Sequence, residues 1–427
     1  MISPITISKI YSQLGNSNSL VPLAIKDIAN SAGMSAGSYI SGDKHEGKDR
    51  FMDEFGTMAI WLFGIPFFKK VLDFVLFKPF KLDPTIDVRN FKNADILKKS
   101  AEFAPNEKIK AGIEKVAKNQ KLFKGLTLTR FIASTILTIV SYGAFTKYRH
   151  KVTENAIRKE LLDKKKQQEL TQNTNEPYFT GGFSDFMFSP VKNLMIVDGA
   201  ITTERFAQSR NKQDLTGYII KEGAFWGFVY FAGDKIKNYL EKKVEKKYNR
   251  SIDLDSRVIE SDELKNALSD GKLKKSLIEF EKSAGKSDLE IYEFINKNPE
   301  NFVVEMAKKS DIIPTLKKTD IIDTRKFVDI SEVKLTKTKL EKLLNQFEGE
   351  KANTTKSKEE FLEEFLHSLK KLKRKSVLKN IGICIGALGV AVPLTMIALR
   401  YSGGEKQEFQ TKKEIEKQLE FEANIKD

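Results

Sequence analysis

Hydrophobic residues gather into four blocks along the chain, and Lys-rich polar stretches separate these blocks. An uncharged run of about 18 or more residues is typical of a membrane-spanning helix, whereas one of about 10–14 more often forms a core, re-entrant or interfacial helix. Only the fourth block, Ile381–Leu399, clearly meets that threshold, with 19 consecutive uncharged residues. At about 1.5 Å per residue it reaches roughly 28 Å, close to the thickness of the hydrocarbon core of a bilayer. The pattern therefore predicts a transmembrane helix over 377–401.

The other three blocks are shorter and leave alternatives open. The segment 126–146 contains the uncharged run Phe131–Thr146 and can span if Arg130 extends its charge toward the interface. The segment 55–77 contains a proline, which favours a kink, so it reads either as a bent span or as a re-entrant hairpin. The segment 215–236 is rich in aromatic residues typical of a membrane interface, and its alternative is an aromatic core helix of a soluble fold.

The polar stretches show helical punctuation and no strand alternation over any length. Three pairs match the capping-box pattern at a helix start, namely Ser287 and Glu290, Thr338 and Glu341, and Ser357 and Glu360. Asn298-Pro299 is typical of another helix start. The fold class predicted is mostly α: a multi-pass α-helical membrane protein with a polar helical domain between the third and fourth apolar segments.

The same pattern divides the chain into seven parts. They are a polar N-terminal segment (1–54), a first membrane-associated region (55–148), a charged loop and linker (149–214), the third apolar segment (215–236), a basic helical soluble domain (237–376), the transmembrane helix (377–401) and a charged C-terminal tail (402–427).

The charge balance narrows the expected partners. The net charge is +15, and 61 of the 73 basic residues are Lys. Because bidentate Arg leads in reading bases, this balance argues against specific nucleic-acid recognition. Lys-rich stretches beside apolar segments suit the anionic face of a bilayer. We therefore expect a multi-pass location in the cytoplasmic membrane, contact with anionic lipid headgroups, and a protein partner through 237–376.

Recognisable enzyme chemistry is missing from the sequence. The single cysteine, Cys384, and three widely spaced histidines give no zinc-ligand spacing, and no phosphate-binding or dinucleotide-binding glycine motif occurs. Gly33, Ser35 and Gly37 match the nucleophile-elbow spacing, but their flanks read as a small-residue loop rather than a strand and a helix. We predict no catalytic, cofactor-binding or metal-binding residue.

Ionisable residues within or beside the apolar segments are the candidate functional groups. They are Lys69, Asp73, Arg130, Lys221 and Glu222. An unpaired charge at membrane depth is costly, so each needs a partner or a role. Glu222 could pair with Arg130 or Lys69 from another helix, and Lys69 could instead pair locally with Asp73. Asp53-Glu54 is expected at the level of the lipid headgroups.

Glycines four residues apart mark candidate surfaces for helix packing. Gly223 and Gly227 form one such pair, and Gly382 and Gly386 form another. Small residues at this spacing let helix backbones approach closely in lipid. The two pairs favour a bundle over independent anchors.

These observations favour a non-enzymatic membrane anchor or scaffold whose basic helical domain engages partners or anionic lipid. The alternative is a transporter-like or channel-like helical bundle with a polar site near Glu222.

A reporter-fusion scan at residues 45, 100, 180, 300 and 415 tests the topology. If the segment 126–146 crosses the membrane, the fusions at 100 and 180 will report opposite sides. The same side at both positions would show that this segment does not cross.

Overall fold

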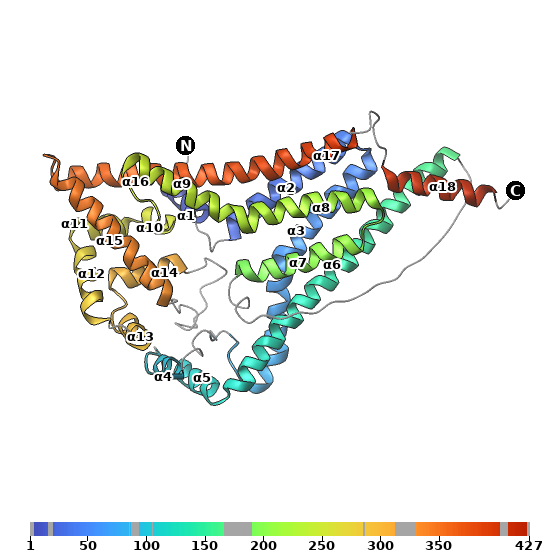
Figure 1. Cartoon of the computed structure of the whole chain (residues 1–427). Coiled ribbons are helices and arrows are strands. Elements are labelled where there is room, and N and C mark those ends of the chain that lie inside the picture. The colour runs from blue at the N-terminus through green and yellow to red at the C-terminus, as the bar shows by residue number, and fades with distance from the viewer. Residues whose placement is uncertain are drawn as a thin grey trace. The chain divides into compact units, whose positions relative to one another are not determined.

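The computed structural model describes residues 4–15, 20–84, 86, 94–104, 106–165, 190–284, 287–311, 330–401 and 409–424. These residues are almost entirely helical and contain no strand, which confirms the mostly α prediction (Figure 1). The chain forms two compact units, each built from three separate stretches. Unit 1 comprises Met1–Pro22, Asp73–Thr127 and Asp234–Ile381, and unit 2 comprises Leu23–Leu72, Leu128–Gly233 and Gly382–Asp427.

Unit 1 has its main apolar core among the helices that follow residue 250. Its helices and helical turns are α1 (Pro4–Leu14), η1 (Asp73–Phe77), η2 (Lys78–Phe80), α4 (Ala94–Glu102), α5 (Glu107–Lys118), α9 (Ala232–Tyr248), α10 (Ser256–Ile259), α11 (Asp262–Ser269), α12 (Lys272–Ser283), α13 (Asp288–Lys297), α14 (Phe302–Asp311), α15 (Ile330–Ala352) and most of α16 (Lys358–Gly386). Val303, Leu340 and Phe365 are fully buried in this core. They lie on α14, α15 and α16, and burial of an apolar stripe on each helix stabilises the unit.

Two of the predicted helix starts are confirmed. The backbone N–H of Glu290 donates to Ser287 Oγ at 3.2 Å, and the backbone N–H of Ser287 donates to Glu290 Oε2 at 2.9 Å, which completes the capping box of α13. The backbone N–H of Glu360 donates to Ser357 Oγ at 3.1 Å at the start of α16. These caps satisfy N–H groups that have no partner within the helix.

The other two predicted starts are wrong. Thr338 lies inside α15, where its hydroxyl donates to the carbonyl of Lys334. Asn298 ends α13, and Asn301 accepts from the N–H of Val303 just before α14 begins. The true start therefore lies three residues further along, because Asn301 can satisfy a free N–H of the first turn.

Unit 2 consists of longer helices. They are α2 (Leu20–Ser41), α3 (Lys44–Leu72), α6 (Gln120–Lys165), α7 (Pro190–Ala207), α8 (Lys212–Trp226), η5 (Gly227–Phe231), η6 (Ala387–Ala391), α17 (Val392–Arg400) and α18 (Gln410–Asn424). Much of the predicted linker, 166–189, lies outside the described residues, and so does 402–408 of the predicted tail. The rest of the tail is mainly the helix α18.

Two of the described helices are long and apolar enough to cross a membrane: Gln120–Leu162, which contains the second apolar block, and Lys358–Arg400, which contains the fourth. Only 33% of the apolar stretch of the first and 28% of that of the second is buried. The rest of each stretch is partly or fully exposed. The apolar blocks of α3 and α8 do not meet the same criterion.

Helices α3 and α6 pack as an antiparallel pair through small residues. A Cβ on Gly64 would lie 2.7 Å from Thr138 Cγ2, and one on Gly56 would lie 2.7 Å from Phe145 Cε1. Gly56, the earlier of the two glycines on α3, contacts the later residue of α6, so the two helices run in opposite directions. These glycines allow the two backbones to approach closely.

Pro393 interrupts the fourth apolar block without ending its helix. Proline has no N–H and cannot donate to the carbonyl four residues earlier. The helix accommodates the missing hydrogen bond in the π-helical turn η6, where the N–H of Val392 donates to Ala387 O, five residues back. The chain then continues as α17.

Helix α2 crosses this π-helical turn at a contact between two glycines. A Cβ on Gly33 would lie 2.8 Å from the carbonyl carbon of Gly389, and one on Gly389 would lie 3.0 Å from Ala29 O. Both are closer than a side chain can approach without displacement. The expected loop around Gly33 and Ser35 is therefore wrong, because these residues form a helix that needs small side chains for packing.

The four glycines predicted to pack against other helices make no such contact with the described residues. A Cβ on Gly223, Gly227, Gly382 or Gly386 would meet no described atom within 4 Å. Close approach of helices in unit 2 uses Gly33, Gly56, Gly64 and Gly389 instead.

Valine substitutions test this assignment. Gly33→Val forces a branched side chain against the Gly389 backbone, and overpacking of this kind costs about 1–3 kcal/mol or more. Gly382→Val carries the same change in helix propensity but points into open space. We expect a lower thermal unfolding temperature for Gly33→Val than for Gly382→Val. Equal shifts for the two variants would contradict the crossing.

Candidate functional site

The buried face of α3 is charged over its first half and apolar over its second. Its buried residues are Glu46, Gly47, Asp49, Asp53, Glu54, Thr57, Trp61 and Ile65. Their spacing of three or four residues places most of them on one stripe of the helix. Asp53 is 0% exposed and Glu54 is 2% exposed. The expectation that these two carboxylates lie among headgroups is therefore wrong.

Arg149 of α6 contacts two carboxylates in the first half of the buried face of α3. Its Nη1 donates to Asp49 Oδ2 at 2.8 Å, and its Nη2 lies 3.8 Å from Asp53 Oδ1. Arg210, just before α8, donates from Nη2 to the same oxygen of Asp49 at 2.6 Å, and Thr153 Oγ1 donates to Asp49 Oδ1 at 2.7 Å. Asp49 thus accepts from two guanidinium groups and a hydroxyl, an arrangement that compensates its burial.

Lys221 and Glu222 of α8 continue the network toward α7. Lys221 Nζ lies 2.8 Å from Glu54 Oε2 and 3.0 Å from Glu222 Oε1. Arg205 of α7 donates to Glu222 from Nη1 and to the hydroxyl of Tyr142 from Nε at 3.2 Å. The structure therefore brings Lys221 and Glu222 together, but Glu222 pairs with Arg205 rather than with Arg130 or Lys69. We use "charged network" below for these groups.

The remaining predicted residues lie away from the charged network. Lys69 Nζ lies 5.9 Å from the ring centre of Phe131, the residue that follows Arg130. Lys69 is twenty residues from Asp49 along α3, or about 30 Å at 1.5 Å per residue. It therefore marks the opposite end of the α3–α6 pair. Asp73 begins η1, which belongs to unit 1, whereas the network belongs to unit 2.

A small cavity of about 20 Å³ lies within the network. It is lined by Asp27, Glu54, Thr57, Met58, Trp61, Asp198, Arg205, Lys221, Glu222 and Phe225. A site needs about 10–15 Å³ to hold one water, so the cavity admits a single water molecule. Asp198 Oδ2 and Glu54 Oε1 face this region without a hydrogen-bond partner among the described residues.

Two carboxyl groups of the cavity are poorly compensated. Asp27 is 8% exposed and lines the cavity beside Lys221 and Glu54. Asp198 is 7% exposed and lines it beside Glu222 and Asp27. Four carboxyl groups (Asp27, Glu54, Asp198 and Glu222) and two cations (Arg205 and Lys221) line the cavity, so its acidic groups outnumber its cations.

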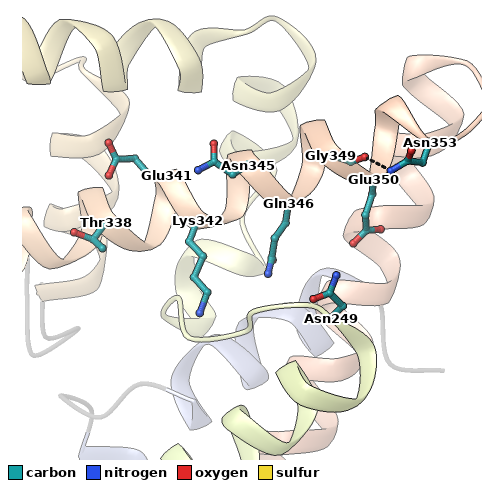
Figure 2. A pocket seen from close by; sticks show the side chains of 9 residues that line it. All are labelled: Asn249, Thr338, Glu341, Lys342, Asn345, Gln346, Gly349, Glu350 and Asn353. Carbon is teal, nitrogen blue, oxygen red and sulfur yellow. Dashed lines mark hydrogen bonds between the residues drawn. The ribbon is translucent and has the colours of Figure 1, made fainter.

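Unit 1 carries an open polar groove of about 670 Å³ along α15 (Figure 2). Its side chains are largely engaged in contacts within the unit. Lys342 Nζ lies 2.6 Å from Glu245 Oε1, Glu350 accepts from Arg250, and Gln346 Oε1 accepts from the N–H of Ser251 at 3.0 Å. These contacts hold α15 against the end of α9 and the residues that follow it, and they leave few groups directed at a ligand.

The chain gives no catalytic arrangement at the nucleophile-elbow match. Ser35 Oγ donates to the carbonyl of Ser31 at 2.7 Å within α2. The strand-to-helix turn that such a nucleophile requires is replaced by a continuous helix. Among the described residues, no group of three or more His, Cys, Asp or Glu side chains could hold a metal ion.

Comparisons with protein-family models, with curated proteins and with solved structures find no match for this chain. The fold and the site define a helical protein with two units and a charged interior in unit 2.

Sequence reasoning missed Asp49, Arg149, Arg205 and Arg210. One usable signal was the spacing of Glu46, Asp49 and Asp53, which extends the same stripe as the apolar residues after them. A second was the placement of Arg. Five of its twelve copies, Arg50, Arg149, Arg205, Arg210 and Arg400, belong to the network or its edge, and Arg is preferred for buried ion pairs.

Substitution of Asp49 tests the energetic role of the network. Asp49→Asn keeps the side-chain size but leaves Arg149 and Arg210 without their shared counter-charge. Breaking a buried pair from one side costs about 3–5 kcal/mol, so we expect a large fall in the free energy of unfolding. Glu363→Gln, which breaks an exposed pair with Lys265, is the control and should leave the unfolding temperature unchanged. Equal effects would contradict the assignment.

The same variant changes the response to acid. Burial alone would raise the pKa of Asp49, but Arg149 and Arg210 outweigh it and hold the pKa below its ordinary value. A depressed pKa contributes stability above the unfolded-state value of about 3.9, and this stability is lost as pH falls through the folded-state pKa. Below about pH 4 the natural chain should therefore lose stability more steeply than Asp49→Asn.

Proposed function

We propose that the chain is an integral membrane protein in which the helices of unit 2 form the membrane-embedded part. One observation carries the proposal: unit 2 buries charge and exposes large apolar side chains. Exposed examples are Phe63 (68%), Phe67 (62%), Val140 (50%) and Leu394 (57%), on α3, α6 and α17. Water-soluble proteins rarely expose large contiguous apolar patches, whereas lipid favours this arrangement.

The limits of the apolar stretches support the same reading. On α3 and α6 the apolar stretches are bounded at one end by the ion pair of Asp49 with Arg149. They are bounded at the other end by the contact of Lys69 with Phe131. That separation is about 30 Å, which matches the hydrocarbon thickness of a bilayer.

The role we propose is a non-enzymatic anchor or scaffold. Lys371, Lys375 and Lys379 are exposed and four residues apart, so they share one face of α16 just before the fourth apolar block. Such a basic face suits anionic headgroups. Lys373 does not contribute, because it is buried and its Nζ lies 2.7 Å from Glu241 Oε1.

A transporter-like bundle is the second candidate, and the carboxylate-rich cavity near Glu222 favours it. Substitution of Glu222 alone does not separate the candidates. Glu222 pairs with both Arg205 and Lys221, so its loss would destabilise an anchor as well as a transport pathway.

A charged residue on the apolar exterior tests the membrane assignment. Val140→Asp places a carboxylate in the middle of the apolar stretch of α6, which costs about 2.5–3.5 kcal/mol in a membrane helix. We expect loss of membrane insertion, measured as protein extracted by alkaline carbonate rather than by detergent alone. Ile278→Asp, at a similarly exposed site (46%) on α12, should insert normally. If Val140→Asp behaves like Ile278→Asp, unit 2 is not embedded in lipid.

A further inference from the structure

Unit 2 contains a second cavity, of about 370 Å³, beside the charged network. Its walls come from α2, α3, α8 and α17, together with the first residue of α18. The volume falls within the range of about 300–1,000 Å³ that is typical of small-molecule sites.

Three buried polar atoms of residues that line this cavity have no hydrogen-bond partner among the described residues. They are Glu46 Oε2, Arg50 Nη1 and Arg400 Nη1. Glu46 and Arg400 are only 8% and 9% exposed. Arg400 Nη2 donates to Glu46 Oε1. This hydrogen bond leaves Arg400 Nη1 and Glu46 Oε2 without a partner. Arg50 Nη1 lies 3.6 Å from Asp53 Oδ2 and 3.8 Å from Glu54 Oε1, beyond hydrogen-bond range.

The unused atoms have complementary chemistry. Two guanidinium nitrogens offer N–H donors to an anionic group, and one carboxylate oxygen accepts from a cationic or neutral donor. The first turn of α8 also lines the cavity, and a helix N-terminus favours an anion. Buried polar atoms without a partner are unfavourable, so a ligand that engages all three gains affinity.

The opposite wall is apolar and keeps open space. Met34, Pro393, Met396 and Ile397 line it. Gly217 of α8 preserves the volume, because a Cβ there would lie 3.1 Å from Met396 Cε and 3.5 Å from Arg50 Nη2. The cavity thus combines a charged end with an apolar end.

We propose that this cavity binds a small zwitterion that carries an apolar group. Its anionic group lies between Arg50 and Arg400, its ammonium group donates to Glu46, and its apolar part contacts Pro393 and Met396. An amino acid with an apolar side chain and the ethanolamine phosphate headgroup of a lipid share this chemistry. The inference goes beyond the anchor role and does not depend on the location of unit 2 in a membrane.

Calorimetric titration of the full chain in detergent tests the site. The probes are L-leucine, its two truncated analogues 4-methylpentanoate and 3-methylbutylamine, and dihexanoyl phosphatidylethanolamine below its micelle concentration. We expect saturable binding of a zwitterion at least tenfold tighter than of either truncated analogue. Binding of L-leucine identifies a free amino acid as the source, and binding of the phosphatidylethanolamine alone identifies a lipid.

Two variants place the binding in the cavity. Gly217→Val fills the space beside Arg50 and should weaken binding at least tenfold, whereas Gly223→Val, on the same helix but facing open space, should not. The double variant Glu46→Gln with Arg400→Gln removes both charges together, so neither is left alone, and it should abolish the preference for the zwitterion. Absence of saturable binding by all four probes, or equal binding by Gly217→Val and the natural chain, would overturn the proposal.

Discussion

Asp49 and Asp53 of α3, held by the guanidinium of Arg149 on α6, impose the constraint that the other helices of unit 2 satisfy. A charge removed from water is costly unless partners surround it, so one buried carboxylate requires several neighbouring helices. α7 supplies Arg205, and α8 supplies Lys221. Each added cation is itself buried and needs a further carboxylate. The network therefore determines which helices pack together and which faces meet.

This constraint also sets the register of the apolar surfaces. Because Asp49 meets Arg149 near one end of the α3–α6 pair, the small residues Gly56 and Gly64 fall opposite the α6 side chains that they accommodate. Other large apolar side chains of the two helices, such as Phe63, Phe67 and Val140, are then left on the outside. The buried charge and the exposed apolar side chains are two results of one pairing.

The sequence allowed some of this to be predicted. An uncharged run as long as the fourth block and a capping box such as Ser287 with Glu290 depend on residues close together in the chain, so both could be read directly. The charged interior could not, because Asp49 and Arg149 are a hundred residues apart and nothing local identifies them as partners. The predicted glycine pairs meet no described atom, for a related reason. Spacing of four defines a helix face, but only the neighbouring helix decides whether that face is used.

Adjacent Lys221 and Glu222 illustrate what a local pattern can and cannot indicate. Neighbouring residues on a helix point in different directions, so burial of both means that α8 has partners on two sides: Glu54 of α3 for the lysine and Arg205 of α7 for the glutamate. Both residues of α8 are thus engaged in ion pairs with neighbouring helices. Binding that requires adjustable contacts is therefore better placed at Arg50 and Arg400, where charge is buried but hydrogen bonds are still unused.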